Sequence, residues 1–395
     1  MEPDGTVLLL PWTRNNMTIA KRMLMASSNA ELGDAGALWG IGPNTQGEIG
    51  DGTTTARSSP VQIGSDLDWI AVSRGEETTA MLKENGTLYT TGKNSNGSLG
   101  LGDTTNRSSP VQVGSLTTWA IIAQMNRALY GCMGAINTSG QLFTWGGGNW
   151  GRLGHGSTTN YSSPVQVGSL TTWRSMSTGY TTCHYVKTDN TLWNCGQGNY
   201  GMLGHGNTTS YSVPTQLGSL TNWSYSTNGE DTTTSALKTD GTIWSWGLAS
   251  SGELGNGTVS SGLTGMSSPV QAGGTGYVQH SGAGGVVHAI DGDGKLWAWG
   301  RGANGGLGDG TTVNKSSRVQ VGSLTNWLSV ASYRNLTVMA VKTDGTLWTW
   351  GTGGAGSLAQ GNTTNYSSPV QVGSLTTWKS FDFELGHKSI GIARV

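Results

Sequence analysis

The chain has 395 residues, of which 65 are glycine and only 11% are charged, and its formal net charge is −1. This balance supplies neither the basic field that attracts nucleic acid nor the polybasic patch that binds anionic lipid. The 17 tryptophans argue against a disordered chain, because large aromatic side chains at regular positions need somewhere to be buried. We therefore expect an all-β protein with short strands and many turns.

The first segment of the chain, residues 1–34, differs from the rest. It carries Glu2 and Asp4 ahead of a very short apolar run, Val7 to Leu10. A secretory signal would begin with positive charge and have a longer apolar core, and a membrane span would need roughly 20 apolar residues. We expect an N-terminal arm that is not cleaved as a signal peptide and that docks on residues 35–395 or on a neighbouring molecule.

From residue 35 onward the sequence repeats with a period of about 50 residues, which is typical of propellers and solenoids. Three markers each occur seven times. The residue that opens the third strand of each copy is Leu38, Leu88, Leu142, Leu192, Ile243, Leu296 or Leu347. The glycine four places later is Gly42, Gly92, Gly146, Gly196, Gly247, Gly300 or Gly351. The glutamine of the fourth strand is Gln62, Gln112, Gln166, Gln216, Gln271, Gln320 or Gln371.

Each copy predicts four short strands. In the copy that starts at Trp327, the second strand ends in the turn Asp344-Gly345, which favours a tight hairpin. The third strand, Leu347 to Gly351, is apolar on both faces, so it belongs between stacked sheets. Pro369 opens the fourth strand, and a proline suits an outer strand because it removes one hydrogen-bond donor. Stacking seven such antiparallel sheets around an axis predicts a seven-bladed β-propeller.

The two ends of the chain are expected to share the last blade. The C-terminal part supplies strands at Trp378 to Phe383 and Lys388 to Ala393, and then the chain ends where a hairpin turn belongs. The missing strands are found near the beginning, at Gly36 to Trp39 and Ser58 to Gly64. Pairing them closes the ring and removes an open sheet edge. Fifteen of the 17 tryptophans fall at repeat positions and are expected to pack between blades.

The repeat unit of L-W-x-W-G, a glycine-rich loop, L-G-x-G and S-P-V-Q-V resembles the regulator of chromosome condensation repeat family, from Gly36 to the C-terminus. This resemblance implies a seven-bladed propeller closed by its two ends. It implies no single activity, because members include an exchange factor for the GTPase Ran, an ultraviolet-B photoreceptor and an inhibitor of β-lactamases. The family's Gly-x-x-His-Thr/Ser motif is replaced here, for example by Gly75-Glu76-Glu77-Thr78, so exchange activity is not carried over. The near-identical S-S-P-V-Q-V-G-S-L-T-T-W copies resemble repeats of bacterial and viral surface proteins.

No catalytic or metal-binding motif is present in the sequence. None of the six histidines has a ligand spacing, and the three cysteines form no C-x-x-C pair. Cys183 and Cys195 flank one hairpin and are either bonded or buried thiols, of which we favour thiols. Asp291 to Gly294 resembles the start of a calcium loop, but it coincides with a predicted hairpin turn and lacks the later glutamate. We predict neither an enzyme nor a bound metal or cofactor.

The candidate binding residues are those that depart from the repeat in the loop between the third and fourth strands. Two consecutive copies carry matching sets, Trp150, His155 and Tyr161 in one and Tyr200, His205 and Tyr211 in the next. Equivalent loops of adjacent blades emerge side by side, so these residues predict one aromatic patch that binds a glycan or a protein. Arg57 and Arg107 predict a basic sector beside it. The alternative is that the two copies are recent duplicates with solvent-facing variation.

Two insertions interrupt the repeat, within Gln124 to Gly134 and Gly257 to Met266. Inserted loops on a rigid repeat commonly hold contacts, and tolerated length variation explains them equally well.

These features lead to two functional hypotheses. The first is a non-catalytic structural or adhesive protein of a virus particle, in its tail or surface, with its location on the virion or an extracellular surface. Its arm would bind other structural proteins, and its aromatic patch a cell-surface glycan or protein receptor. The alternative is a soluble protein–protein interaction module of bacterial origin, an inhibitor or a scaffold. Neither hypothesis involves nucleic acid or membrane insertion.

Overall fold

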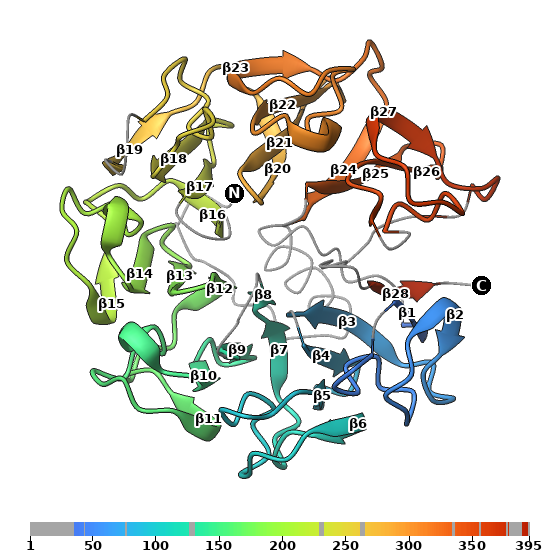
Figure 1. The fold of residues 1–395 in the computed structure, drawn as a ribbon. Helices are drawn as coiled ribbons and strands as arrows, with labels where there is room; N and C mark the ends of the chain where they lie inside the picture. The colour runs from blue at the N-terminus through green and yellow to red at the C-terminus, as the bar shows by residue number, and fades with distance from the viewer. Residues whose placement is uncertain are drawn as a thin grey trace, which may run out of the picture.

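The computed structural model describes residues 35–42, 44–75, 77–125, 131–228, 233–260, 265–333, 336–354, 357–376, 378 and 389–393. The predicted arm, residues 1–34, lies outside the described residues. The described strands form seven sheets that are arranged around a common axis, as Figure 1 shows. The prediction of a seven-bladed β-propeller is therefore confirmed.

Blades 1 to 6 each have strands A, B, C and D, which run from the axis outward. Blade 1 consists of β3 (Trp69–Arg74), β4 (Thr78–Lys83), β5 (Leu88–Gly92) and β6 (Arg107–Gln112). Blade 2 consists of β7 (Trp119–Ile122), β9 (Met133–Asn137), β10 (Leu142–Gly146) and β11 (Tyr161–Gln166). Blade 3 consists of β12 (Trp173–Thr178), β13 (Thr182–Lys187), β14 (Leu192–Gly196) and β15 (Tyr211–Gln216).

The remaining blades follow the same order. Blade 4 consists of β16 (Trp223–Asn228), β17 (Thr233–Lys238), β18 (Ile243–Gly247) and β19 (Met266–Gln271). Blade 5 consists of β20 (Tyr277–Ala283), β21 (Val286–Asp291), β22 (Leu296–Gly300) and β23 (Lys315–Gln320). Blade 6 consists of β24 (Trp327–Ser332), β25 (Thr337–Lys342), β26 (Leu347–Gly351) and β27 (Tyr366–Gln371). Among the described residues, short 3-10 helices follow the C strands of blades 2, 3 and 5, namely η1 (Asn149–Gly151), η2 (Asn199–Gly201) and η3 (Ala303–Gly305).

Blade 7 closes the ring with strands from both ends of the chain. β28 (Ser389–Ala393) pairs antiparallel with β1 (Ala37–Gly42), which in turn pairs with β2 (Arg57–Gln62). Ala37 lies opposite Ala393, and Ile41 lies opposite Ser389. The predicted closure is confirmed for these three strands (Figure 1). The predicted innermost strand, Trp378 to Phe383, lies outside the described residues except for Trp378.

The propeller has two rims. On the turn rim, the B–C hairpin turns meet the linkers between blades, as where the Trp119 backbone N–H donates to the Gly86 carbonyl over 3.0 Å. On the loop rim, the A–B loops meet the C–D loops, as where the Lys93 N–H donates to the Glu77 carbonyl over 2.7 Å. All candidate binding residues belong to C–D loops or to the first residues of D strands, so they lie at the loop rim.

The core lies between the blades, where the tryptophans that precede the last residue of the C strands of blades 2, 4, 5 and 6 are fully buried. Three of them, Trp145, Trp246 and Trp299, donate from their indole Nε1 atoms to carbonyls of the preceding blade. The acceptors are the carbonyls of Ser98 (3.0 Å), Met202 (2.8 Å) and Glu253 (3.1 Å). A Cβ added at Gly100 would lie only 2.8 Å from the Trp145 Nε1 atom, so the loop needs glycine there to seat the indole. The expected packing between blades is confirmed for this class of tryptophan.

The insertion in blade 2 contributes a strand to blade 3. β8 (Gln124–Met125) pairs in parallel with β12, with Gln124 opposite Ser177 and Met125 opposite Thr178. This part of the insertion therefore adds a fifth strand at the inner edge of blade 3, and residues 126–130 lie outside the described residues. Directly before the second insertion, Asn256 forms an isolated bridge with Ser317 of blade 5, and residues 261–264 of the insertion lie outside the described residues.

Candidate functional site

The turn rim carries a repeated unit of a lysine between two aromatic rings. The last residues of three B strands, Lys187, Lys238 and Lys342, place their Nζ atoms 3.7, 3.9 and 3.5 Å from the ring centroids of Trp193, Trp244 and Trp348. The first residue of strand A supplies a second ring, whose centroid lies 4.8–5.1 Å from the same Nζ atom. These residues are Trp173, Trp223 and Trp327. Burial lowers the pKa of all three lysines. This unit packs the blade.

Blade 5 builds the same unit from different residues. Asp291 occupies the position of the lysine, and Arg318 occupies a position where the other outer strands have proline. The Arg318 guanidinium carbon lies 4.2 Å from the Trp297 centroid and 5.9 Å from that of Tyr277. Trp297 donates from Nε1 to Asp291 Oδ2 over 2.8 Å. In five blades a cation over these rings therefore contributes to packing, and we place no candidate site on the turn rim.

The hairpin turn of blade 5 contains Asp291 to Gly294, the segment that resembles the start of a calcium loop. Asp291 Oδ1 accepts hydrogen bonds from the backbone N–H groups of Asp293 and Lys295, each over 3.0 Å. The turn interpretation is confirmed by these bonds, because the carboxylate oxygen is used to hold the turn.

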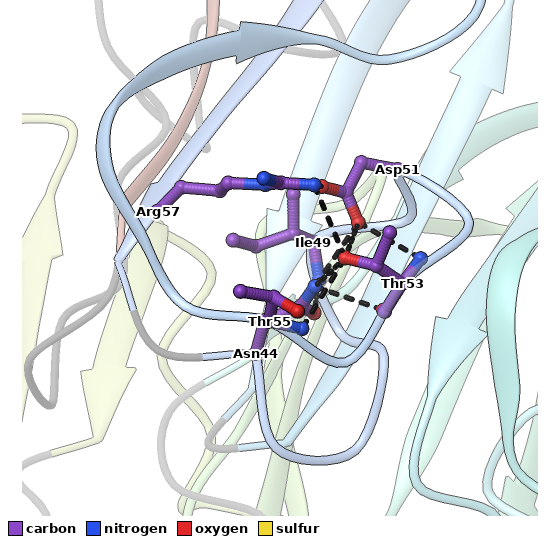
Figure 2. Close-up of polar contacts among 6 residues, drawn as sticks. All are labelled: Asn44, Ile49, Asp51, Thr53, Thr55 and Arg57. Atoms are coloured by element: carbon purple, nitrogen blue, oxygen red, sulfur yellow. Dashed lines mark hydrogen bonds and ion pairs between the residues drawn. The ribbon is translucent and has the colours of Figure 1, made fainter.

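On the loop rim, the C–D loops of every blade except blade 4 are closed by a pair of side chains six residues apart or fewer. In blade 7 the pair is Asp51 and Arg57 (Figure 2), whose Oδ2 and Nη2 atoms are 2.5 Å apart. Asn44 donates from Nδ2 to Asp51 Oδ1 over 3.1 Å and to the Thr53 carbonyl over 2.9 Å. Burial raises the pKa of Asp51, but hydrogen bonds from Thr53 and Arg57 outweigh it and hold the pKa below its usual value.

The two arginines of the predicted basic sector are both engaged in ion pairs. Arg57 pairs with Asp51, and Arg107 pairs with Asp103 over 2.6 Å. Lys315 and Asp309 form the corresponding pair in blade 5, over 3.6 Å. A carboxylate therefore balances each cation in this part of the rim.

Four of the six predicted aromatic-patch residues form the same kind of loop closure. The rings of His155 and Tyr161 meet edge to face with centroids 5.0 Å apart, and so do those of His205 and Tyr211. His155 Nε2 hydrogen-bonds Thr144 Oγ1 over 2.9 Å, and His205 Nε2 hydrogen-bonds Asn194 Oδ1 over 2.7 Å. Burial lowers the pKa of both histidines. These residues close their loops and are half-buried.

The other two residues, Trp150 and Tyr200, have a backbone conformation that aromatic residues rarely adopt. Their φ and ψ angles are 59° and 12° for Trp150 and 58° and 13° for Tyr200. Asn304 has the same conformation in blade 5, and asparagine tolerates it well. For other L residues this left-handed region costs on the order of 1–2 kcal/mol. Both aromatic residues are half-buried.

The loop rim of blades 2 and 3 has a further buried residue, Arg152, that the repeat pattern alone did not single out. Its Nε donates to the Gly147 carbonyl over 2.8 Å, and its Nη1 donates to the Tyr180 carbonyl over 2.6 Å. Arg152 therefore ties the C–D loop of blade 2 to the A–B loop of blade 3. The available signal was an arginine at the position that Ser98 and Met202 occupy in the neighbouring copies.

Gly151 explains why the Trp150 loop is held so tightly. A Cβ added at Gly151 would lie 2.4 Å from the Ser212 Cβ atom at the start of blade 3's outer strand. Blade 2's loop is thus seated on blade 3, and the equivalent contact of Gly201 is with Ser267 of blade 4. The structure places Trp150 and Tyr200 on equivalent, rigidly seated loops of adjacent blades.

Among the described residues, no group of three or more His, Cys, Asp or Glu side chains is arranged to hold a metal ion. No helix in the described part of the chain is long and apolar enough to cross a membrane.

Comparisons with known proteins support the repeat on independent grounds. The family model of the regulator of chromosome condensation (RCC1) repeat matches residues 85–123, 139–185, 189–234, 293–339 and 344–389. The human E3 ubiquitin-protein ligase HERC2 is 27% identical over 242 residues, which are 60% of this chain and only 4% of the ligase. The chain therefore spans a small part of the curated relatives that it matches.

Two solved structures share the fold. Prp20p from Saccharomyces cerevisiae, described together with its binding to Gsp1p and histones, has a TM-score of 0.78 and 16% identity and covers 93% of both chains. Human WBSCR16 has a TM-score of 0.76 and 17% identity over 92% of this chain and 100% of its own. RCC1-type propellers are protein-interaction modules. By the match over more than half of its length, this chain belongs to the RCC1 repeat family.

Proposed function

We propose that this propeller is a non-catalytic protein-interaction module whose contact surface is the loop rim of blades 2 and 3, with Trp150 and Tyr200 as anchors. The observation that carries the proposal is the left-handed conformation of both aromatic residues. Strained backbone positions persist where the surrounding structure imposes them, and they cluster at functional sites.

The geometry suits the binding of a protein surface. Trp and Tyr are the residues that most often anchor interfaces, because they bury a large area and have few rotatable bonds. Here their loops are already seated by Gly151 and Gly201 and braced by the His–Tyr pairs. Binding would therefore require little ordering of the loops, which favours affinity.

A matched pair of double variants tests this proposal. Trp150→Asn with Tyr200→Asn, the loop-rim variant, removes both rings and introduces the residue that blade 5 uses in the same conformation. The control, Leu170→Asn with Leu220→Asn, removes two turn-rim side chains that are 44% and 47% exposed. Each protein would be coupled to a cross-linker and used to capture proteins from an extract of the source cells, with yields measured by mass spectrometry.

We expect at least one protein to be captured by the wild type and by the control but not by the loop-rim variant. Equal capture by all three proteins would reject this surface. If the loop-rim variant lost its folded circular dichroism spectrum, the two rings would be core residues and the proposal would fail. A glycan array run in parallel distinguishes a glycan ligand from a protein ligand. Glycan binding that is lost only in the loop-rim variant would show that this surface binds a glycan and not a protein.

We keep a finer hypothesis for the location of this module, that it is a structural or adhesive component of a virus particle. The near-identical repeat copies support it, whereas the relatives found are cellular proteins of human, mouse and yeast. In this role residues 1–34 would bind neighbouring structural proteins. Immunogold electron microscopy of the source culture tests it. Label on particles or tails is the expected result, and label confined to the cell interior would favour the soluble inhibitor or scaffold.

A further inference from the structure

The interface between blades 2 and 3 lacks the tryptophan that fills four of the other interfaces. Cys195 occupies the position of Trp145, Trp246 and Trp299 at the end of strand C. Its Sγ donates to the Arg152 carbonyl over 3.2 Å, as the indoles donate to the equivalent carbonyls. A thiol is much smaller than an indole, and the space is filled by Cys132, Cys183 and Tyr185, all of them fully buried.

Two of these thiols come from different blades and touch each other. Cys132 precedes β9 of blade 2, and Cys183 is the second residue of β13 in blade 3. Their Sγ atoms are 3.4 Å apart. Cys183 stands where Thr79 and Thr234 stand in blades 1 and 4, and those hydroxyls donate to carbonyls of the preceding blade over 2.7 and 3.1 Å. Here the contact with the preceding blade is made by a pair of thiols instead.

We propose that Cys132 and Cys183 are a redox modification site, at which a peroxide forms a reversible disulfide between blades 2 and 3. A disulfide bond is about 2.05 Å long, so the sulfurs would need to approach by about 1.4 Å, a shift that small side-chain rotations can supply. The Cys132 thiolate attacks hydrogen peroxide and gives a sulfenic acid and hydroxide. The Cys183 thiol then displaces the sulfenic oxygen as water, so two thiols are oxidised and one peroxide is reduced.

The environment assigns different roles to the two sulfurs. The hydrogen bond from Cys183 lowers the pKa of Cys132, and the Arg152 charge acts in the same direction. Burial raises the pKa of Cys183, which therefore keeps its proton as the resolving thiol. Both residues are close to the loop-rim ends of their strands, so opening of a single strand end, rather than of the whole blade, gives a small oxidant access.

Cys195 is the competing partner, because it lies directly opposite Cys183 in the β13–β14 pair. Its sulfur is already engaged with the Arg152 carbonyl and with the Tyr185 hydroxyl, 3.4 Å away. Burial raises its pKa to about 12, so it has almost no thiolate at neutral pH. The inter-blade pair is therefore favoured over the pair within blade 3.

Peptide mapping of the unmodified full chain tests this proposal. The reduced protein would be treated with hydrogen peroxide, denatured, alkylated with iodoacetamide and digested without reduction. We expect a linked pair of peptides that contain Cys132 and Cys183, an alkylated Cys195, and reversal by dithiothreitol. The oxidised chain should also have the higher Tm, because the bond closes a segment whose ends are 51 positions apart.

Two variants give the matched controls. Cys132→Ser should abolish the link and the rise in Tm, whereas Cys195→Ser should leave both unchanged. Three alkylated thiols after oxidation, a sulfinic acid on Cys132 without a link, or a link between Cys183 and Cys195 would each overturn the proposal. These readouts do not depend on binding at the loop rim, so the proposal stands or falls separately from the proposed function.

Discussion

On the turn rim, blades 1, 3, 4 and 6 place a lysine between two aromatic rings, and blade 5 rebuilds the same arrangement with Arg318. On the loop rim, the pair that closes the C–D loop changes from Asp51 and Arg57 to His155 and Tyr161. Both solutions satisfy packing. On the turn rim the interaction of a cation with two rings is kept even where the residues change. On the loop rim only the position of the closing pair is kept, and its chemistry changes.

Trp150 and Tyr200 fit none of these cases. The equivalent Asn304 of blade 5 adopts the same backbone conformation at lower cost, so the strain of the aromatic residues is not needed to form the loop. The comparison of the two rims therefore distinguishes residues that stabilise the propeller from Trp150 and Tyr200, whose conformation the fold does not require.

The largest expected effect is acid unfolding, which would remove the ring on which both rims depend. Burial lowers the pKa of His184 and His280 to about 3 and that of His288 to about 4. In the unfolded chain the same histidines are protonated near pH 6.5. The three buried histidines therefore contribute fully to stability above that pH, and this contribution is lost as the pH falls toward their folded-state pKa values. At pH 5.5 the loss should be about 1.4 kcal/mol per histidine, or about 4 kcal/mol together.

Urea unfolding at pH 7.5 and pH 5.5 measures this loss. The control is the triple variant with glutamine at these three positions, which should show a much smaller difference between the two pH values. An unchanged urea midpoint for the wild type would show that the histidines are not held neutral by burial.

The second effect tests whether blade 5 has truly rebuilt the turn-rim unit. Arg318→Pro removes the cation from Trp297 and should cost about 1–2 kcal/mol, since both residues are half-buried. The triple variant Asp291→Lys, Lys295→Thr, Arg318→Pro reproduces the residues of blade 6 and should recover most of the loss. Thermal and urea unfolding of the two variants give the comparison. Equal instability of both would mean that Arg318 stabilises blade 5 in a different way.

A smaller effect is expected from removing a cation on the turn rim of a regular blade. Lys342→Met keeps the apolar stem but removes the ammonium 3.5 Å from the Trp348 centroid, which should cost about 1 kcal/mol. Blade 2 provides the natural precedent, because it has Asn137 at this position. The free energy of unfolding from urea titrations measures the loss, and a stable variant would show that only the aromatic rings matter.

The smallest effect has the opposite sign. Trp150→Asn should raise the free energy of unfolding by up to about 1 kcal/mol, because asparagine tolerates the left-handed conformation. The same substitution should weaken partner capture. A gain of stability with a loss of binding is the signature that separates the loop rim from the turn rim in one variant. A loss of several kcal/mol would instead identify Trp150 as a packing residue.

The fold could be predicted from the sequence because the same strand and turn pattern occurs in every copy of the repeat. Each third strand begins at or next to the predicted apolar residue, for example at Leu88, Leu142 and Leu347. The pairing of the two ends was also predictable, because each end carries an incomplete copy. Local residue spacing was sufficient in these cases, since a blade contacts mainly its own strands and its neighbours.

The chemistry of the site was less accessible. The aromatic set in blades 2 and 3 was visible, but the contact between His155 and Tyr161 depends on how the intervening loop closes. Only the following glycine hints at the left-handed conformation of Trp150. The role of Arg318 depends on the register between β22 and β23, which are joined by a long loop. The contact of Cys132 with Cys183 depends on how two different blades pack together.

The pairing of β1 with β28 has a consequence for biosynthesis. β1 is translated long before its inner neighbour β28, because nearly all of the propeller lies between them in the sequence. At roughly 5–20 residues per second, β1 waits on the order of tens of seconds for this neighbour, with one sheet edge unpaired. Such an edge is a template for association with other chains. Translation speed and early occupancy of this edge by a chaperone thus become determinants of yield, independent of how stable the closed ring is.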